Sequence, residues 1–252
     1  MIEVRALQKS FGTQRVLNEV TLRIETGEAV VIIGASGGGK SVLLKHLIGL
    51  LQPDSGQVLV DGEDIGRMNE RQLLRVRRKF GMLFQSAALF DSMTVAENVG
   101  FALRQSGRFR ENEITNKVGE ALAMVELPGT ENKKPAQLSG GMRKRVGLAR
   151  AIVYQPEIVL YDEPTTGLDP IAADRIDRLI IRVCEQLKVT SVAVTHDMRS
   201  AGRIGQRIVM LHDGHVHTTG TPEEVFRSTD PIVHAFVNGI SELPEPAAGL
   251  KT

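Results

Sequence analysis

The pattern of apolar and polar positions divides the chain into a strand-rich beginning and a helical middle. Residues 20–24 alternate between apolar and polar, whereas residues 29–33 form an unbroken apolar run. Alternation predicts a half-exposed strand, and a short unbroken run predicts a strand that is covered on both faces. Residues 58–60 lead into Asp61-Gly62, a dipeptide typical of hairpin turns. The first third of the chain is therefore predicted to consist of short strands.

Two further apolar strands are predicted late in the chain, at residues 158–161 and 191–194. Between about residues 87 and 155 the pattern is helical and strand patterns are absent. Fully apolar strands that are separated by helical segments favour a parallel sheet with helices on both faces. We therefore predict an α/β fold with a helical subdomain, at about residues 87–155, inserted into the core.

Composition narrows the class of protein. The chain has 252 residues, enough for one large domain or a core with a subdomain, and its 42% apolar and 24% charged residues are typical of a globular protein. The formal net charge of +1 gives no argument for a nucleic-acid partner. The single cysteine, Cys184, lies in a helix-like run at residues 176–187 and fits a reducing compartment. Membrane-span and signal-peptide patterns are not found, so we expect a cytosolic chain that meets a membrane only through a partner.

A glycine-rich segment, GASGGGKS at residues 34–41, lies between the strand at 29–33 and a predicted helix at 41–50. This context is typical of a phosphate-binding P-loop. Glycines allow backbone N–H groups to converge on phosphate oxygens, and the start of the helix adds a positive dipole end. Lys40 would reach the β- and γ-phosphates, and the Ser41 hydroxyl would bind Mg²⁺. The alternative is a glycine-rich turn without a ligand.

A pair of acidic residues, Asp162 and Glu163, follows the apolar strand at 158–161. Successive strand residues point in different directions, so the two carboxylates can serve different functions. Asp162 suits the shell of Mg²⁺, which prefers oxygen ligands. Glu163 suits the orientation or deprotonation of an attacking water. Without the P-loop, such a pair would be interpreted as the start of a loop.

The segment Leu138-Ser139-Gly140-Gly141-Met142 precedes a helical stretch at residues 143–153. A serine and glycines at the start of a helix form a second potential anion-binding terminus. The alternative is that Ser139 serves only as an N-cap. The basic residues Arg143, Lys144 and Arg145 are predicted to lie on the solvent-exposed surface of this helix.

Together these motifs resemble the ATP-binding subunits of ABC transporters, and the resemblance covers about residues 1–240. Residues 138–142 match the signature sequence of that family, and Gln85 matches its Q-loop glutamine. The D-loop corresponds to Gly167-Leu168-Asp169, and the switch histidine corresponds to His196. Phe11 stands where the family places an aromatic residue against adenine. The implied fold is a P-loop NTPase (RecA-like) α/β core with an antiparallel β subdomain and the inserted helical subdomain.

The resemblance implies ATP hydrolysis, with Mg²⁺, between two copies of the chain arranged head to tail. The catalytic residues would be Glu163, His196, Lys40 and Gln85, and Mg²⁺ would be held by Ser41, Gln85 and Asp162. The implied ATP-binding residues are Phe11, Gly34, Ala35, Ser36, Gly37, Gly38, Gly39, Lys40, Ser41, Val42, Gln85 and Asp162. The second copy would contribute Ser139, Gly140, Gly141 and Asp169 in trans.

The amino-acid sequence around the motifs is similar to that of the MlaF-type ATPases of the Mla and Mce-associated systems, at residues 84–95, 141–146 and 163–171. Such systems transport phospholipid or other lipids in bacteria. The resemblance implies an MlaE-like permease, an MCE-domain lipid-binding protein and a STAS-domain subunit as partners. It also implies a peripheral position on the cytoplasmic face of the inner membrane. Residues 241–252, with Pro244 and Pro246, are expected to form an extended tail that lies on the partner ATPase.

Alternative functions stay open at this point. Within transporters, the runner-up is the ATPase of a small-nutrient importer. A non-transport ABC ATPase would carry a coiled-coil insertion or a second fused ATPase domain. A P-loop kinase would have no use for residues 138–142, and a non-hydrolytic scaffold would not need Lys40 and Glu163.

Overall fold

The computed structural model describes residues 1–240, so the predicted tail at residues 241–252 lies outside the described part. Its larger sheet has six strands in the order β10-β9-β3-β8-β7-β6. The strands are β3 (Ala29–Ile33), β6 (Phe80–Leu83), β7 (Ile158–Asp162), β8 (Thr190–Val194), β9 (Arg207–His212) and β10 (His215–Gly220). All neighbours pair in parallel except β10 with β9, which form a hairpin around Asp213-Gly214. The predicted parallel sheet is confirmed.

A second, smaller sheet is antiparallel and has the strand order β2-β1-β4-β5. Its strands are β1 (Ile2–Phe11), β2 (Gln14–Ile24), β4 (Ser55–Val60) and β5 (Glu63–Asp64). The turn at Asp61-Gly62 joins β4 to β5, as its sequence predicts. This sheet is the antiparallel β subdomain that the family resemblance implies beside the P-loop core.

Two hydrophobic cores cover the faces of the larger sheet. Val31 of β3 packs with α5 (Gly140–Ile152), α6 (Pro170–Leu187) and α7 (Met198–Ile204) on one face. Its neighbour Ile32 packs with α1 (Lys40–Leu47) and the antiparallel sheet on the other face. Because successive strand residues point to opposite faces, a strand covered on both sides must be apolar throughout. This accounts for the unbroken apolar runs in the sequence.

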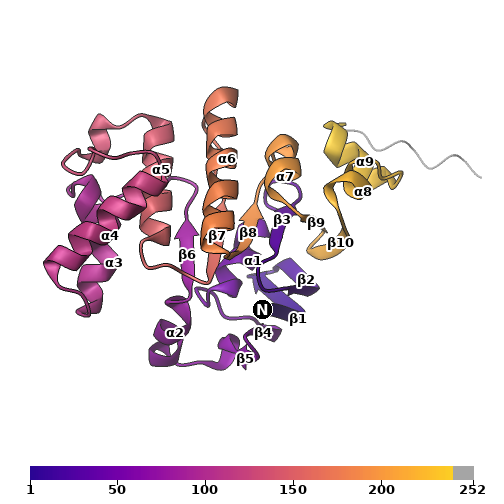
Figure 1. Cartoon of the computed structure of the whole chain (residues 1–252). Coiled ribbons are helices and arrows are strands. Elements are labelled where there is room, and N and C mark those ends of the chain that lie inside the picture. The colour runs from indigo at the N-terminus through magenta and orange to yellow at the C-terminus, as the bar shows by residue number, and fades with distance from the viewer. Residues whose placement is uncertain (241–252) are drawn as a thin grey trace, which may run out of the picture.

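The helical subdomain contains α3 (Val95–Ser106), α4 (Glu111–Met124) and the start of α5. It lies beyond β6 at one end of the sheet, at the left of Figure 1. A capping box between Thr94 and Glu97 starts α3, and Gly107 ends it with a left-handed φ of 63°. Along the described residues, the segment between β6 and β7 contains no strand, as the helical pattern predicts.

The remaining short elements connect or close these layers. They are the 3₁₀ turns Ile65–Arg67 and Pro135–Gln137 and the helices α2 (Glu70–Arg77), α8 (Pro222–Phe226) and α9 (Pro231–Asn238). Of the helices within residues 1–240, none is long and apolar enough to cross a membrane.

Two helix boundaries differ from the prediction. Helix α1 ends at Leu47 rather than at residue 50, because the backbone at Gly49 turns to a left-handed φ of 67°. Helix α6 begins at Pro170, well before the apolar run at residues 176–187, because Asp169 caps it and proline is favoured in the first turn.

Candidate functional site

The glycine-rich loop joins β3 to α1, as predicted, and close packing explains two of its glycines. At Gly34, with φ of 148°, a Cβ atom would lie 2.4 Å from the Leu211 carbonyl oxygen. At Gly39, with φ of 90°, a Cβ atom would lie 2.8 Å from Leu17 Cδ2 and 2.9 Å from the Val16 carbonyl oxygen. Both positions therefore require glycine on conformational and steric grounds. The loop is held between β9 and β2 in a fixed shape.

Lys40 and Ser41 are the first residues of α1 and are already engaged within the chain. The Lys40 ammonium donates hydrogen bonds to the carbonyl oxygens of Gly34 (2.8 Å) and Ala35 (2.9 Å). Burial lowers the pKa of Lys40, and the nearby carboxylates of Glu163 and Asp162 act in the opposite direction. The Ser41 hydroxyl donates to Asp162 Oδ1 at 2.8 Å. Serine and carboxylate oxygens side by side form a donor set that suits Mg²⁺.

The acidic pair lies at the carboxyl end of β7, next to the loop. The parallel register pairs Asp162 with Val194 at the end of β8, and β8 pairs with β3. Ligands of open α/β sheets bind outside the carboxyl ends of the strands. Glu163 is buried and its φ of 49° is left-handed, a strained conformation for a residue with a Cβ atom. Its backbone N–H donates to the Val194 carbonyl oxygen at 2.9 Å, which holds the turn.

Two further contacts and one pocket surround the Glu163 carboxylate. His196 Nδ1 lies 2.9 Å from Glu163 Oε2. The Thr166 hydroxyl donates to the same oxygen at 3.1 Å. A pocket of about 250 Å³ is lined by Ser36, Gly37, Gly39, Lys40, Ser41, Val42, Gln85, Glu163 and His196. The fold therefore collects residues from four distant segments around one cavity at the P-loop.

Five predicted residues do not line this pocket: Gly34, Ala35 and Gly38 of the loop itself, and Asp162 and Phe11. Asp162 faces a neighbouring cavity, which Gln85 also lines. Phe11 lies at the tip of the β1–β2 hairpin, with its side chain 48% exposed and the Lys9 ammonium 5.7 Å from the centre of its ring. The hairpin continues into Val16 and Leu17, which border Gly39, so Phe11 lies on an element that packs against the loop. Its predicted contact with adenine stays a prediction.

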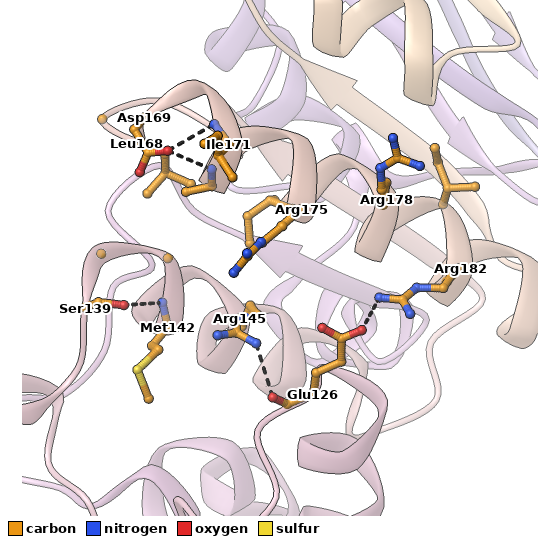
Figure 2. Close-up of a pocket in the computed structure, with 16 residues that line it drawn as sticks. Glu126, Ser139, Met142, Arg145, Leu168, Asp169, Ile171, Arg175, Arg178 and Arg182 are labelled. Carbon is orange, nitrogen blue, oxygen red and sulfur yellow. Dashed lines mark hydrogen bonds and ion pairs between the residues drawn. The ribbon is translucent and has the colours of Figure 1, made fainter.

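The signature residues and the D-loop aspartate come together at a second location. Ser139 caps α5 by accepting a hydrogen bond from the Met142 N–H at 3.3 Å. Asp169 caps α6 by accepting from the N–H groups of Ile171 and Ala172. A Cβ atom on Gly141 would be 4.0 Å from Ala172 Cβ, so the first turns of the two helices lie against each other. Figure 2 shows this cleft, which has a volume of about 960 Å³.

Basic side chains surround the cleft. Arg182 forms an ion pair with Glu126 at 2.5 Å, and Arg178 forms one with Asp174 at 2.8 Å. Arg145 donates to the Glu126 carbonyl oxygen at 3.1 Å. Arg175 points from α6 toward the α5 side of the cleft, and within residues 1–240 it has neither an ion pair nor a hydrogen bond. The start of α5, which is capped by the neutral Ser139, and the guanidinium group of Arg175 make the cleft favourable for an anion.

Lys144 contradicts the prediction of a solvent-exposed basic run on this helix. The Lys144 side chain is only 5% exposed, whereas Arg143 is exposed and Arg145 half-buried. The Lys144 ammonium donates to the carbonyl oxygens of Gln85 (2.5 Å) and Glu163 (3.1 Å). Burial lowers its pKa, against the opposing effect of the Glu163 and Asp162 carboxylates. The sequence could not show that Lys144 is buried. Three consecutive basic residues do not indicate which one of them points into the protein.

A phosphate-binding loop, an acidic strand end and a second helix-start motif define the chain as a nucleotide-binding protein of the P-loop class. The family described as "ABC transporter" matches residues 17–166, which is more than half of the chain. The protein therefore belongs to the ABC transporter family, and it is an ATPase cassette of that family.

Curated relatives carry different names. "Probable ribonucleotide transport ATP-binding protein mkl" of Mycobacterium tuberculosis is 45% identical over 94% of this chain and 66% of its own length. "Protein trigalactosyldiacylglycerol 3, chloroplastic" of Arabidopsis thaliana is 42% identical over 97% of this chain and 75% of its own length. "Sulfate/thiosulfate import ATP-binding protein CysA" of Bordetella pertussis is 43% identical over 96% of this chain and 68% of its own length. The chain thus spans just under two thirds of the mkl protein.

Among solved structures, one is described as a dimeric post-hydrolysis state of the ATP-binding cassette MJ0796 bound to ADP and Pi. It is 35% identical to this chain, covers 88% of it and 99% of the other chain, and superimposes with a TM-score of 0.81. This similarity confirms the predicted cassette fold, with its P-loop core, antiparallel sheet and helical subdomain.

Proposed function

We propose that this chain powers lipid transport through a separate membrane permease, by hydrolysing ATP between two copies of itself. The observation that carries the proposal is the convergence of Lys40, Ser41, Gln85, Glu163 and His196 on one pocket at the P-loop. These polar residues come from four segments that are far apart in the sequence, and only Lys40 and Ser41 share an element. Convergence of this kind is expected where a phosphate chain and an attacking water must be held together.

Within one chain, the roles follow from position. Lys40 would exchange the Gly34 and Ala35 carbonyl oxygens for phosphate oxygens when ATP enters. Ser41, Asp162 and Gln85 would hold Mg²⁺, which neutralises phosphate charge when bound. Glu163 would orient or deprotonate the water, and His196, which contacts Glu163 at 2.9 Å, would hydrogen-bond the γ-phosphate. Phe11 would stack on adenine from the adjacent hairpin.

The cleft between α5 and α6 would receive the nucleotide that is held by a second copy. Ser139, Gly140 and Gly141 start one helix and Asp169 starts the other, so the N-terminal ends of both helices border the cleft. The solved MJ0796 cassette is described as dimeric, which supports this arrangement. ATP would favour the closed pair because it contacts both chains only in that state. Loss of phosphate would remove the bridge and let the pair open.

The test of hydrolysis is Glu163→Gln, which keeps the size of the side chain and removes its basicity. We expect kcat to fall by about 10²–10⁴-fold, the usual contribution of a general base. ATP binding, measured with a fluorescent ATP analogue, is expected to persist. Glu157→Gln is the matched control, because Glu157 is exposed just before β7. A Glu163→Gln protein that releases phosphate at the parent rate would contradict the assignment.

Lipid as the transported class has two supports. The sequence around the motifs resembles the MlaF-type ATPases, and one relative is named for a galactolipid. The MlaE-like permease, the MCE-domain protein and the STAS-domain subunit are the corresponding proposed partners. The chain would then sit peripherally on the cytoplasmic face of the bacterial inner membrane. A nutrient importer is the second candidate, favoured by the CysA and mkl names.

These two candidates can be separated with the permease that co-purifies with this chain in mild detergent. The complex is reconstituted into liposomes that contain a fluorescent phospholipid. We expect ATP-dependent lipid movement that disappears when the complex carries Glu163→Gln. ATP-dependent uptake of sulfate or a nucleotide, without lipid movement, would instead establish the importer.

A further inference from the structure

One buried lysine side chain connects three parts of the molecule that the proposed mechanism uses separately. Lys144 lies one turn into α5, the helix that starts at the signature residues Ser139–Gly141. Its ammonium group contacts the Gln85 carbonyl oxygen, just beyond β6, and the Glu163 carbonyl oxygen, just beyond β7. The signature residues would serve the nucleotide of the partner, whereas Gln85 and Glu163 would serve the nucleotide of the same chain. Lys144 therefore links helix α5 directly to the segments that carry Gln85 and Glu163.

The environment of Lys144 makes this connection specific. An ammonium group has three donors and needs them satisfied when it is buried, and here two of them are used on backbone carbonyls. Hydrogen bonds from a charged donor are short and strong, so they fix the positions of both acceptors relative to α5. One of those acceptors belongs to Glu163, whose strained left-handed backbone is sensitive to how its peptide groups are held.

We propose that Lys144 is a positioning residue that sets the backbone of Glu163 and Gln85 according to the position of α5. A nucleotide that arrives at Ser139–Gly141 from the second copy shifts or fixes α5, and Lys144 transmits that change to the carboxylate that acts on the chain's own nucleotide. Hydrolysis at one site thereby depends on occupancy of the other. The inference rests on the proposed two-chain site.

The first experiment compares Lys144→Met with Arg143→Met in the full-length chain. Methionine keeps the length and packing of the lysine stem and removes the charged donor. We expect Lys144→Met to lower kcat by about tenfold, to change KM for ATP by less than about twofold, and to reduce the Hill coefficient toward 1. Arg143 loses the same charge from the same helix, but it is exposed, so its variant calibrates the general effect of that charge. Lys144→Arg, which restores donors to both carbonyls, is expected to recover part of kcat.

The second experiment uses mixed dimers of differently tagged chains, each with Glu163→Gln in one chain, so that a single site hydrolyses ATP. Lys144→Met is placed either in the chain with intact Glu163 or in the Glu163→Gln chain. Both arrangements contain the same substitutions, so any folding penalty is common to them. We expect the rate to fall about tenfold in the first arrangement and to stay near that of the unsubstituted mixed dimer in the second.

In the mixed dimer, the nucleotide that is hydrolysed faces α5 of the Glu163→Gln chain. If Lys144→Met only weakened α5, the loss would therefore be larger in the second arrangement. That result, or equal rates in the two arrangements, would overturn the role of Lys144. If Lys144→Met does not fold, Lys144→Gln is placed in the same two arrangements with the same expected contrast. Parent chains that bind MgATP but never form a dimer would contradict the two-chain site itself. That outcome is separate from a dimer in which the two arrangements behave alike.

Discussion

The P-loop pocket and the cleft between α5 and α6 are both helix starts with glycines, yet they differ in what the chain supplies. In the P-loop pocket, of about 250 Å³, Lys40 is satisfied by loop carbonyls and Ser41 by Asp162. In the cleft, of about 960 Å³, the helix starts are capped, but Arg175 is without an ion-pair or hydrogen-bond partner among residues 1–240. In the P-loop pocket the polar side chains of Lys40 and Ser41 have partners before a ligand binds, whereas the cleft carries a positive charge, on Arg175, that has no counter-charge within the described part of the chain.

This difference indicates how a single sequence can encode two halves of one site. The P-loop pocket contains the Lys40 ammonium group and the Glu163 carboxylate together, so it can hold a nucleotide and also act on it. The cleft is lined by two carboxylates, and both are already engaged: Asp169 caps α6 and Glu126 is paired with Arg182. Neither is therefore available to activate a water. The cleft is suited to bind phosphate from a neighbour and not to catalyse on its own.

The largest expected effect is a loss of ATP affinity in the P-loop pocket. Lys40→Met removes the ammonium group that would contact the β- and γ-phosphates, and charge-assisted hydrogen bonds of this kind are worth about 1.5–3 kcal/mol. We expect ATP affinity to fall about 10–100-fold, measured by titration calorimetry. Lys117→Met in α4 removes the same charge far from the loop and serves as the control. Parent-like affinity in Lys40→Met would show that the loop does not hold the phosphates.

A substitution in the cleft between α5 and α6 should affect ATP-dependent dimerisation without lowering the stability of the chain. Gly141→Asp places a carboxylate in the first turn of α5, where the helix dipole favours it by about 0.3–1 kcal/mol. The same charge would repel the phosphate of a neighbouring nucleotide. We expect an unchanged or higher melting temperature, normal ATP binding by the single chain, and at least about tenfold weaker ATP-dependent dimerisation.

Gly141→Asn is the matched control, because it has the same size without the charge. The backbone at residue 141 is not left-handed, and a Cβ atom there meets nothing closer than Ala172 Cβ at 4.0 Å. Equal dimerisation of the Asp and Asn variants would contradict an anion in the cleft.

A smaller effect is expected for Arg175→Ala, which removes the guanidinium without a partner. Long-range attraction of an exposed charge is modest, so ATP-dependent dimerisation should weaken about two- to fivefold at low salt and converge with the parent at about 0.5 M salt. Arg178→Ala is the comparison, because Asp174 already neutralises Arg178. Analytical ultracentrifugation over a salt series measures both. A larger loss for Arg178→Ala would contradict the difference between paired and unpaired arginines.

The smallest effect concerns Asp177, which lies on α6 and accepts a hydrogen bond from Ser200 of α7 at 2.9 Å. Its Oδ1 atom is buried without a partner among the described residues, and burial raises its pKa above the usual 3.8 despite Ser200 and Arg203. A raised pKa means that the ionised form destabilises the fold as pH rises from about 4 through the folded-state pKa. Asp177→Asn should therefore gain melting temperature relative to the parent at pH 7.5 but not at pH 4. The opposite trend would contradict a desolvated carboxylate.

Much of the fold is accessible from the sequence because burial leaves a direct pattern. Strands covered on both faces must be apolar, so β3, β7 and β8 can be located. The start of α6 cannot, because its first turn is solvent-facing and the sequence motif identifies its capping residue, Asp169, only as a D-loop residue. Capping depends on backbone geometry that residue type only partly specifies.

For the candidate site, local motifs locate Lys40, Ser41, Asp162 and Glu163, since each adjoins a strand or helix end. Charge patterning places Lys144 on the helix surface, and the structure shows it buried instead. Its partners are backbone carbonyls of Gln85 and Glu163, which have no signature in the sequence because every residue carries a carbonyl. Contacts of this kind become visible only when the strands are placed in register.

We expect the P-loop pocket of one copy and the cleft of a second copy to form one nucleotide site. The most direct measurement is the mass in solution of the Glu163→Gln chain, by light scattering, with MgATP and with MgADP. We expect a dimer with MgATP and a monomer with MgADP, because only the γ-phosphate would bridge the two halves. A Glu163→Gln chain that binds MgATP and remains a monomer at all concentrations would contradict it.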